Sequence, residues 1–149
     1  MIRLFLDANV LFTAAHNSSG KAALILDLGA QGYSEVMSCA YAIEEARRNI
    51  SIKFPDQLKR FEALIAAVIK VPSKSGRNCP ALLPEKHRPV LEAAIQCKAS
   101  HLLTGGDIKD FGLFMNKPSL TGGVLIQTVS KFLESRMRSE SKKGVGRNK

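Results

Sequence analysis

Acidic side chains occur at several points of the sequence where a divalent cation could be held. The candidates are Asp7, Glu45, Asp107 and Asp110. Carboxylates that lie close together repel one another, and a hard divalent cation is the usual means of holding several of them. Oxygen ligands suit Mg²⁺ or Mn²⁺ better than zinc. A site of this kind activates water and stabilises charge on a phosphoryl group, so the predicted chemistry is phosphodiester hydrolysis.

Asp7 directly follows the apolar run 2–6, which predicts a buried strand. A carboxylate at that point is partly desolvated and needs a compensating group. Two interpretations are equally open from position alone: a ligand of the site, or the N-cap of the helix that begins just after it. Asn9, two residues further on, is a candidate for the edge of the site, where it would contact a ligand or the substrate.

Glu44 and Glu45 lie in a predicted helix whose apolar face contains Ala42, Ile43 and Ala46. Neighbouring helical residues differ by about 100° in direction, so only one of the two carboxylates can face a site on the sheet. The alternative is that both are solvated and pair with basic residues three or four positions away.

The segment 104–112 is the most informative in the chain. A predicted strand ends in Thr104, two glycines allow a tight turn, and Asp107 and Asp110 follow at a spacing of three. That spacing puts both acids on one side of a helical turn, and Phe111 would anchor the turn in the core. The alternative is a loop in which aspartate serves as a turn and cap residue.

Short apolar runs alternate with helical stretches, which predicts an α/β domain with a mostly parallel sheet of about five strands. The expected strands are 2–6, 33–38, 68–71, 101–104 and 124–126. The expected helices are a short one through 10–12, then 21–31, 38–50, one from Pro55 to about 65, 89–98 and about 129–137, with Ser38 as an N-cap. Functional residues in such folds lie at the carboxyl ends of the strands, which is where Asp7 and Asp107 fall.

The chain has 149 residues, a length sufficient for one domain, which we expect at residues 1–135. Its net charge is +9. Residues 136–149 carry six Lys or Arg against one Glu and almost no apolar residues, so we expect a mobile basic tail. Such a tail binds phosphates in some proteins and only adds solubility in others.

Three cysteines, Cys39, Cys79 and Cys97, are far apart and have no pattern typical of zinc ligands or a disulfide framework. No apolar run reaches the roughly 18 residues that cross a bilayer, and the run 2–6 is too short for a signal peptide. We therefore expect a cytoplasmic protein with no membrane partner.

Four segments together resemble the PIN-domain nucleases, with closest similarity to the VapC-like toxins of prokaryotic toxin–antitoxin systems. They are LDANVLF at 6–12, the stretch 38–49 with Glu44-Glu45-Ala46, RPVLEAA at 88–94 and LTGGDIKDFG at 103–112. Each is weak alone, and four in the right order and spacing are specific. The resemblance covers roughly residues 1–133.

The resemblance implies a three-layer α/β/α fold, an acidic pocket that binds Mg²⁺ or Mn²⁺, and cleavage of RNA. Asp7 matches the family's first acid, Glu45 rather than Glu44 its second, and Asp107 the acid after the fourth strand. Asp110 matches a more variable position that sometimes carries a fourth ligand. An antitoxin partner and a homodimer are implied in the same way.

The sequence departs from the family at two points. His87 stands where the family usually has Asp, and a neutral imidazole binds Mn²⁺ but is a poor Mg²⁺ ligand. Glu85 could reach in instead. The second departure is an extra glycine after Thr104, which shifts the loop by one residue. His87, Glu85 and Thr104 are therefore candidates for the edge of the site.

Basic residues near these motifs are candidates for RNA phosphates, although ordinary surface charge is the simpler interpretation of some of them. They are Arg88, Lys109, Arg136 and Arg138. A PIN-like module that binds RNA or a protein without cleaving remains an alternative to a nuclease. A phosphotransferase with Asp7 as nucleophile fits less well, because such enzymes of the haloacid-dehalogenase type place a second Asp where this chain has Asn9.

Overall fold

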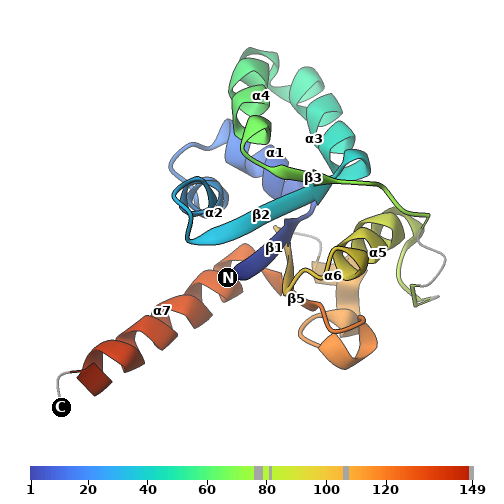
Figure 1. Ribbon diagram of the computed structural model, residues 1–149. Coiled ribbons are helices and arrows are strands. Elements are labelled where there is room, and N and C mark those ends of the chain that lie inside the picture. Colours follow the sequence, from blue (N-terminus) through green and yellow to red (C-terminus); the bar gives the residue numbers. More distant parts are fainter. Residues whose placement is uncertain (76–78, 81, 106–107, 148–149) are drawn as a thin grey trace.

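A five-stranded, all-parallel sheet forms the centre of the computed structural model, which describes residues 1–75, 79–80, 82–105 and 108–147. Its strands are β1 (Ile2–Leu6), β2 (Ser34–Cys39), β3 (Ile69–Val71), β4 (His101–Thr104) and β5 (Leu125–Thr128). They lie in the order β3-β2-β1-β4-β5, with β1 in the middle (Figure 1). The α/β class with a parallel sheet is confirmed.

The central position of β1 explains its composition. Leu4, Phe5 and Leu6 are almost fully buried, because β1 pairs with β2 on one side and β4 on the other and helices cover both faces. A parallel sheet covered in this way needs strands that are apolar on both faces. The end of β1 is therefore enclosed by a neighbouring strand on each side and by helices on both faces.

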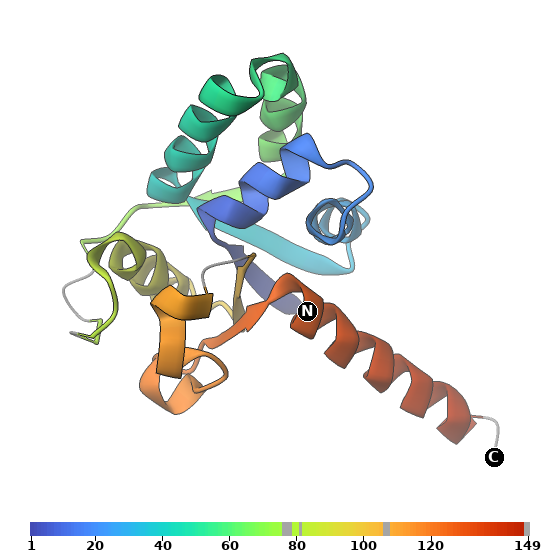
Figure 2. The same cartoon turned by 180° about the vertical axis from the view of Figure 1, so that it is seen from behind.

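Helices complete the three layers. They are α1 (Ala8–His16), α2 (Lys21–Ala30), α3 (Ala40–Lys53), α4 (Leu58–Ala66), α5 (Arg88–Gln96), α6 (Ile108–Phe111) and α7 (Val129–Arg147). Figures 1 and 2 show α1, α3 and α4 on one side of the sheet and α5 on the other. Short 3₁₀ turns precede α4 (Pro55–Gln57) and α5 (Glu85–His87), and two more (Gly112–Phe114 and Pro118–Leu120) lie between α6 and β5.

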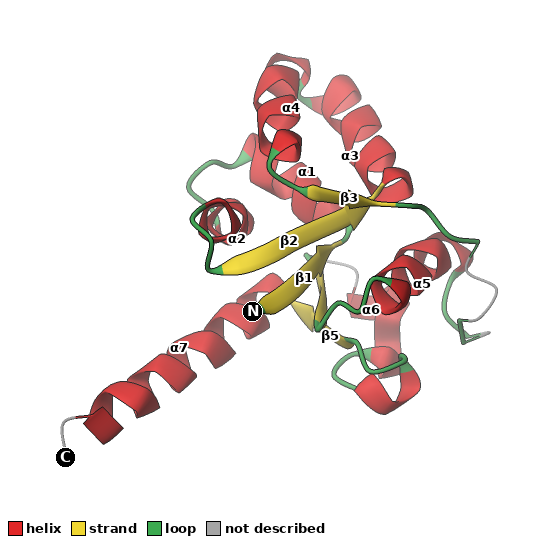
Figure 3. Ribbon diagram, in the orientation of Figure 1, coloured by secondary structure: helices red, strands yellow, loops and turns green. Residues whose placement is uncertain are grey.

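Two helices are longer than expected. The helix after Asp7 runs to His16, because Ala14 and Ala15 extend its buried face. The last helix continues past Met137 to Arg147 and projects away from the sheet, as the coloured elements of Figure 3 show. The division into a domain at 1–135 and a tail at 136–149 stays a prediction. In the part of the chain that the structure describes, no helix is long and apolar enough to cross a bilayer.

Ser38 does not have the expected role of helix N-cap. It is the fifth residue of β2, and Cys39, which is buried, occupies the N-cap of α3 without a side-chain cap bond. The hydroxyl of Ser38 instead donates a buried hydrogen bond of 2.8 Å to the carbonyl oxygen of Leu6. This bond ties the end of β2 to the residue before Asp7.

We predict that Ser38→Ala lowers the free energy of unfolding by about 1–3 kcal/mol, because it removes a hydrogen bond that water cannot replace. Ser51→Ala is the matched control: its hydroxyl also donates to a backbone carbonyl at 2.8 Å, that of Arg47, but in an exposed position. The control should lie within about 0.5 kcal/mol of wild type. Urea unfolding of both variants measures the difference, and equal effects would contradict the role given to Ser38.

Candidate functional site

A cleft of about 220 Å³ opens at the carboxyl edge of the sheet, beside the end of β1. The chain proceeds from β1 to β2 and β3 in one direction and from β4 to β5 in the other. The β1–β4 pair is therefore the point at which the strand order reverses, and open α/β sheets bind ligands at such points. The cleft is lined by Asp7, Ala8, Asn9, Phe12, Glu45, Asn49, Lys53, Lys86 and His87.

Asp7 is both the N-cap of α1 and part of the cleft lining. One carboxylate oxygen, Oδ1, accepts a hydrogen bond of 2.8 Å from the backbone N–H of Ala8. The other, Oδ2, lies 3.8 Å from Nδ1 of His87. Only 3% of Asp7 is exposed, and its backbone N–H continues the β1–β4 pairing by donating to Leu103. The two interpretations of Asp7 from the sequence are therefore compatible.

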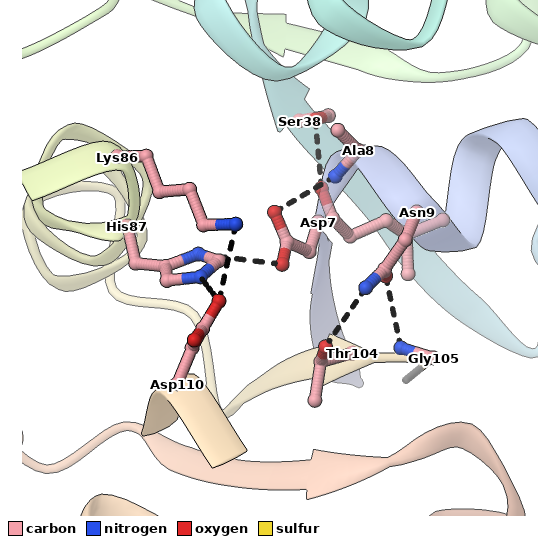
Figure 4. Close-up of polar contacts among 10 residues, drawn as sticks. Asp7, Ala8, Asn9, Ser38, Lys86, His87, Thr104, Gly105 and Asp110 are labelled. Carbon is pink, nitrogen blue, oxygen red and sulfur yellow. Dashed lines mark hydrogen bonds and ion pairs between the residues drawn. The ribbon is translucent and has the colours of Figure 1, made fainter. Parts of the chain in front are cut away.

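Asn9 links the first turn of α1 to the end of β4. Its side-chain nitrogen donates to the hydroxyl of Thr104 at 3.3 Å, and its side-chain oxygen accepts from the backbone N–H of Gly105 at 2.9 Å (Figure 4). Thr104 is fully buried. Asn9 thus ties Thr104 and Gly105 to the first turn of α1, next to Asp7.

One face of α3 supplies the opposite wall of the cleft. Glu45, Asn49 and Lys53 are four residues apart and share a helix face, and all three line the cleft. Glu44 points elsewhere: its carboxylate forms an ion pair with Arg47, which also pairs with Glu62 at 2.6 Å. Of the two adjacent glutamates, the structure therefore brings only Glu45 to Asp7.

His87 lies between two carboxylates. Its Nε2 is 3.0 Å from Oδ2 of Asp110, and its Nδ1 faces Asp7 (Figure 4). The ring also packs on Phe111, with centroids 4.5 Å apart. Lys86 also reaches Asp110, with Nζ 3.1 Å from the same Oδ2. A buried polar ring needs such partners, and these contacts explain how the imidazole of His87 is accommodated at this position.

These contacts change the acidity of Asp110. The hydrogen bond from His87, and secondly that from Lys86, hold the pKa of the Asp110 carboxyl below its ordinary value. The side chain remains about one-third exposed. Asp110 contacts two basic side chains of the turn before α5, those of Lys86 and His87. It meets one ring nitrogen of His87, and Asp7 faces the other.

The donor set of the cleft fits a hard divalent cation. Asp7 and Glu45 offer carboxylate oxygens, and Asn49 adds an amide, which are the donors that Mg²⁺ and Mn²⁺ prefer. Within the described residues no group of three or more His, Cys, Asp and Glu forms a complete cation site. Asp107, the third acid predicted for this site, lies outside the described residues.

Glu85, a candidate for the edge of the site, does not line the cleft. It lies in the 3₁₀ turn before His87 and is exposed. The turn directs His87 inward instead, where only 3% of the residue is exposed.

The predicted RNA-binding residues have different surroundings. Arg88 donates from Nε to the carbonyl oxygen of Leu83 at 2.7 Å, so its guanidinium also supports the loop before α5. Arg136 lines an apolar groove beside Phe132, away from the acidic cleft, and Arg138 is exposed on α7. The side chain of Lys109 lies outside the described part of the structure.

Sequence reasoning missed five residues of the cleft lining: Ala8, Phe12, Asn49, Lys53 and Lys86. A signal was present for two of them, because Asn49 and Lys53 continue the spacing of four residues that begins at Glu45. Phe12 lies just beyond the first turn of α1, in a helix that the sequence predicted without giving this side chain a role. No sequence pattern marks Lys86.

Comparison with solved structures establishes the fold. No protein-family model and no curated protein matches the sequence. Among solved structures, a chain of VapBC2 from Rickettsia felis bound to a promoter DNA fragment superposes with a TM-score of 0.62 at 13% identity, covering 85% of this chain and 98% of that one. The chain has a PIN-like fold. This confirms the three-layer architecture that the sequence resemblance implied.

Two further structures with this PIN-like fold superpose over a similar length. DNA-bound VapBC from Salmonella typhimurium has a TM-score of 0.61 at 11% identity and covers 87% of this chain and 99% of that one. FitAB bound to the IR36 DNA fragment has a TM-score of 0.56 at 15% identity, with 85% and 94% covered. At these identities the likeness establishes the fold alone.

The environment of Asp110 gives a prediction for NMR. In wild type the carboxyl of Asp110 should titrate below the ordinary range of Asp. Lys86→Gln and His87→Gln should each raise this pKa. The increase should be larger in His87→Gln, because His87 is the larger cause of the lowered pKa. A lowered pKa means that the contact stabilises the fold above the ordinary Asp range and that this contribution is lost as pH falls through the lowered value.

Carbon-detected titration of the carboxyl measures these shifts, with Lys117→Gln as a control, since Lys117 is not among the groups that lower the pKa of Asp110. An Asp110 pKa that is the same in wild type and in both variants would contradict the contacts described.

Proposed function

We propose that this chain is a divalent-metal-dependent endoribonuclease that hydrolyses RNA phosphodiester bonds, and that it is the toxin of a toxin–antitoxin pair. One observation carries the proposal: the carboxylates of Asp7 and Glu45, 38 positions apart in the sequence, line one cleft at the strand-order reversal of a PIN-like sheet. The separate resemblance of the four sequence segments to VapC-like toxins supports the same family.

Asp7 and Glu45 would hold Mg²⁺ or Mn²⁺, with Asp107 as the third ligand that the sequence resemblance implies. The bound ion supplies a Lewis acid that activates water and stabilises negative charge on the phosphoryl group. The residues of the chain contribute the rest. A carboxylate of the cleft accepts the proton of the attacking water. Lys86, which lines the same cleft, offers positive charge to the phosphate.

His87 influences which ion acts best. Its Nδ1 faces the Asp7 carboxylate, so a ligand that binds Mn²⁺ better than Mg²⁺ stands beside the central acid. Its bond to Asp110 fixes the ring orientation, as partners of metal-binding histidines usually do. We therefore expect Mn²⁺ to support cleavage better than Mg²⁺.

The antitoxin is proposed on chemical grounds as well as from the resemblance. A cleft lined by carboxylates attracts Arg or Lys, so a partner segment that inserts such a side chain between Asp7 and Glu45 would block the site. The homodimer stays an expectation from the resemblance. The cytoplasmic location stays an expectation from the short apolar runs of the sequence.

A second function is favoured by the basic groups of the cleft. Lys53, Lys86 and His87 line the same cavity as the two carboxylates, and this mixture suits an RNA- or partner-binding PIN-like module that does not cleave. The two functions differ in one outcome, which is phosphodiester cleavage by the wild-type protein.

Glu45→Gln and Glu44→Gln form a matched pair that tests the proposal. We predict that Glu45→Gln and Asp7→Asn each slow RNA cleavage by at least about 100-fold, because each removes a ligand charge, whereas Glu44→Gln cleaves like wild type. Gel analysis of a labelled RNA with Mn²⁺, Mg²⁺ or chelator measures the rates.

Cleavage that persists in chelator, or that is lost equally in Glu44→Gln and Glu45→Gln, would contradict the metal mechanism. RNA binding by the wild type without cleavage under either ion would establish the binding module instead.

A further inference from the structure

Three aromatic rings gather where the C-terminal ends of α1 and α3 meet. They belong to Phe12, His16 and Phe54, and we call them the aromatic cluster. The rings of His16 and Phe54 are nearly parallel, with centroids 4.7 Å apart and an angle of 14° between planes. Phe12 lies at 4.9 Å from His16 and 5.8 Å from Phe54, tilted against both.

Backbone contacts hold the aromatic cluster in place. Arg60 of α4 donates to the carbonyl oxygens of Ala14 and Ala15, which fixes the last turn of α1 beneath His16. Phe54 is the C-cap of α3, and its backbone N–H donates to Ile50 at 2.8 Å. The positions of the rings therefore depend on the main chain and on the partly buried guanidinium of Arg60, and they do not require the rings themselves to be buried.

The aromatic cluster is open to solvent on one side and reaches the acidic cleft on the other. His16 is exposed and Phe54 is 37% exposed, which is unusual for rings whose only role is packing. Phe12 belongs to the lining of the cleft that contains Asp7 and Glu45. Lys53 lines the cleft too, and its Nζ lies 5.5 Å from the centroid of the Phe12 ring.

We propose that the aromatic cluster binds an unpaired nucleobase of the RNA, and that Lys53 contacts the phosphate between that nucleotide and the cleft. This inference rests on the proposed function. Exposed aromatic rings beside a basic side chain are the combination that binds single-stranded nucleic acid, since every base can stack and every nucleotide carries a phosphate. A strand whose scissile phosphate lies at Asp7 would pass Lys53 before it reaches Phe54.

Such a subsite would distinguish unpaired from paired RNA and would distinguish little among the four bases. Stacking needs a free base face, which a base inside a duplex does not offer, and it discriminates little among the four bases. The chain would therefore select unpaired RNA at a position next to the cut, and the selection would come from Phe54 and His16 and not from the carboxylates.

The test measures binding of a fluorescein-labelled oligouridylate and of the same strand without bases, in an Asp7→Asn background that prevents cleavage. We expect the strand without bases to bind about 5- to 100-fold more weakly. Phe54→Leu and His16→Ala should reduce this ratio toward one, and Lys53→Gln should weaken both strands equally and lower the salt dependence.

Tyr33→Leu is the matched control, because Tyr33 is an exposed aromatic residue beside the start of β2, at the other end of the sheet. It should leave the ratio unchanged. Phe54→Leu keeps the backbone cap of α3, and circular dichroism verifies its fold.

The outcomes separate the subsite from the proposed function. If wild type cleaves RNA but the ratio is the same in Phe54→Leu and in Tyr33→Leu, the subsite is wrong and the nuclease assignment stands. If the aromatic variants bind both strands like the Asp7→Asn parent but lose binding to the purified protein of the adjacent reading frame, the aromatic cluster is a protein-docking surface and the inference fails. If wild type does not cleave, the proposed function fails whatever the ratio.

Discussion

The buried carboxylate of Asp7 is the constraint on which the site depends. A charge with 3% exposure at the end of the central strand is costly unless neighbouring groups compensate it. The structure supplies the N–H of Ala8 at the start of α1, where the helix dipole also favours negative charge, and the imidazole of His87 at 3.8 Å. Both follow from the position of Asp7 between the helical layers.

The elements around Asp7 are joined by a few polar contacts that cross the sheet. Ser38 joins β2 to Leu6, and Asn9 joins α1 to Thr104 and Gly105 at the end of β4. Because these contacts meet within three residues of Asp7, the ends of three neighbouring strands are fixed relative to one carboxylate. A cation site needs such rigidity, since its ligands must be held in place before the ion arrives.

Much of this arrangement could be predicted from the sequence, for local reasons. Leu4, Phe5 and Leu6 predict a buried strand, and the rotation between neighbouring helical residues separates Glu44 from Glu45. The same periodicity would have identified Asn49 and Lys53. Lys86 and Phe54 could not be predicted, because they reach the cleft and the aromatic cluster through the packing of separate elements.

Some differences have a physical cause that the local pattern does not contain. Ser38 is of a residue type that is common at helix N-caps. However, β2 continues one residue further than expected, to Cys39, and the hydroxyl of Ser38 donates to the buried carbonyl oxygen of Leu6 instead. From the sequence alone, His87 indicates that one carboxylate ligand is missing, because it stands where the resembled nucleases usually have Asp. In the structure it is a group that separates and binds two carboxylates, those of Asp7 and Asp110.

Anomalous scattering from a crystal soaked in Mn²⁺ tests the central claim most directly, which is that Asp7 and Glu45 together hold a divalent cation. The account predicts one anomalous peak in coordinating contact with both carboxylates in wild type, and its loss in Glu45→Gln but not in Glu44→Gln. A peak that contacts neither carboxylate, or that persists unchanged in Glu45→Gln, would contradict it.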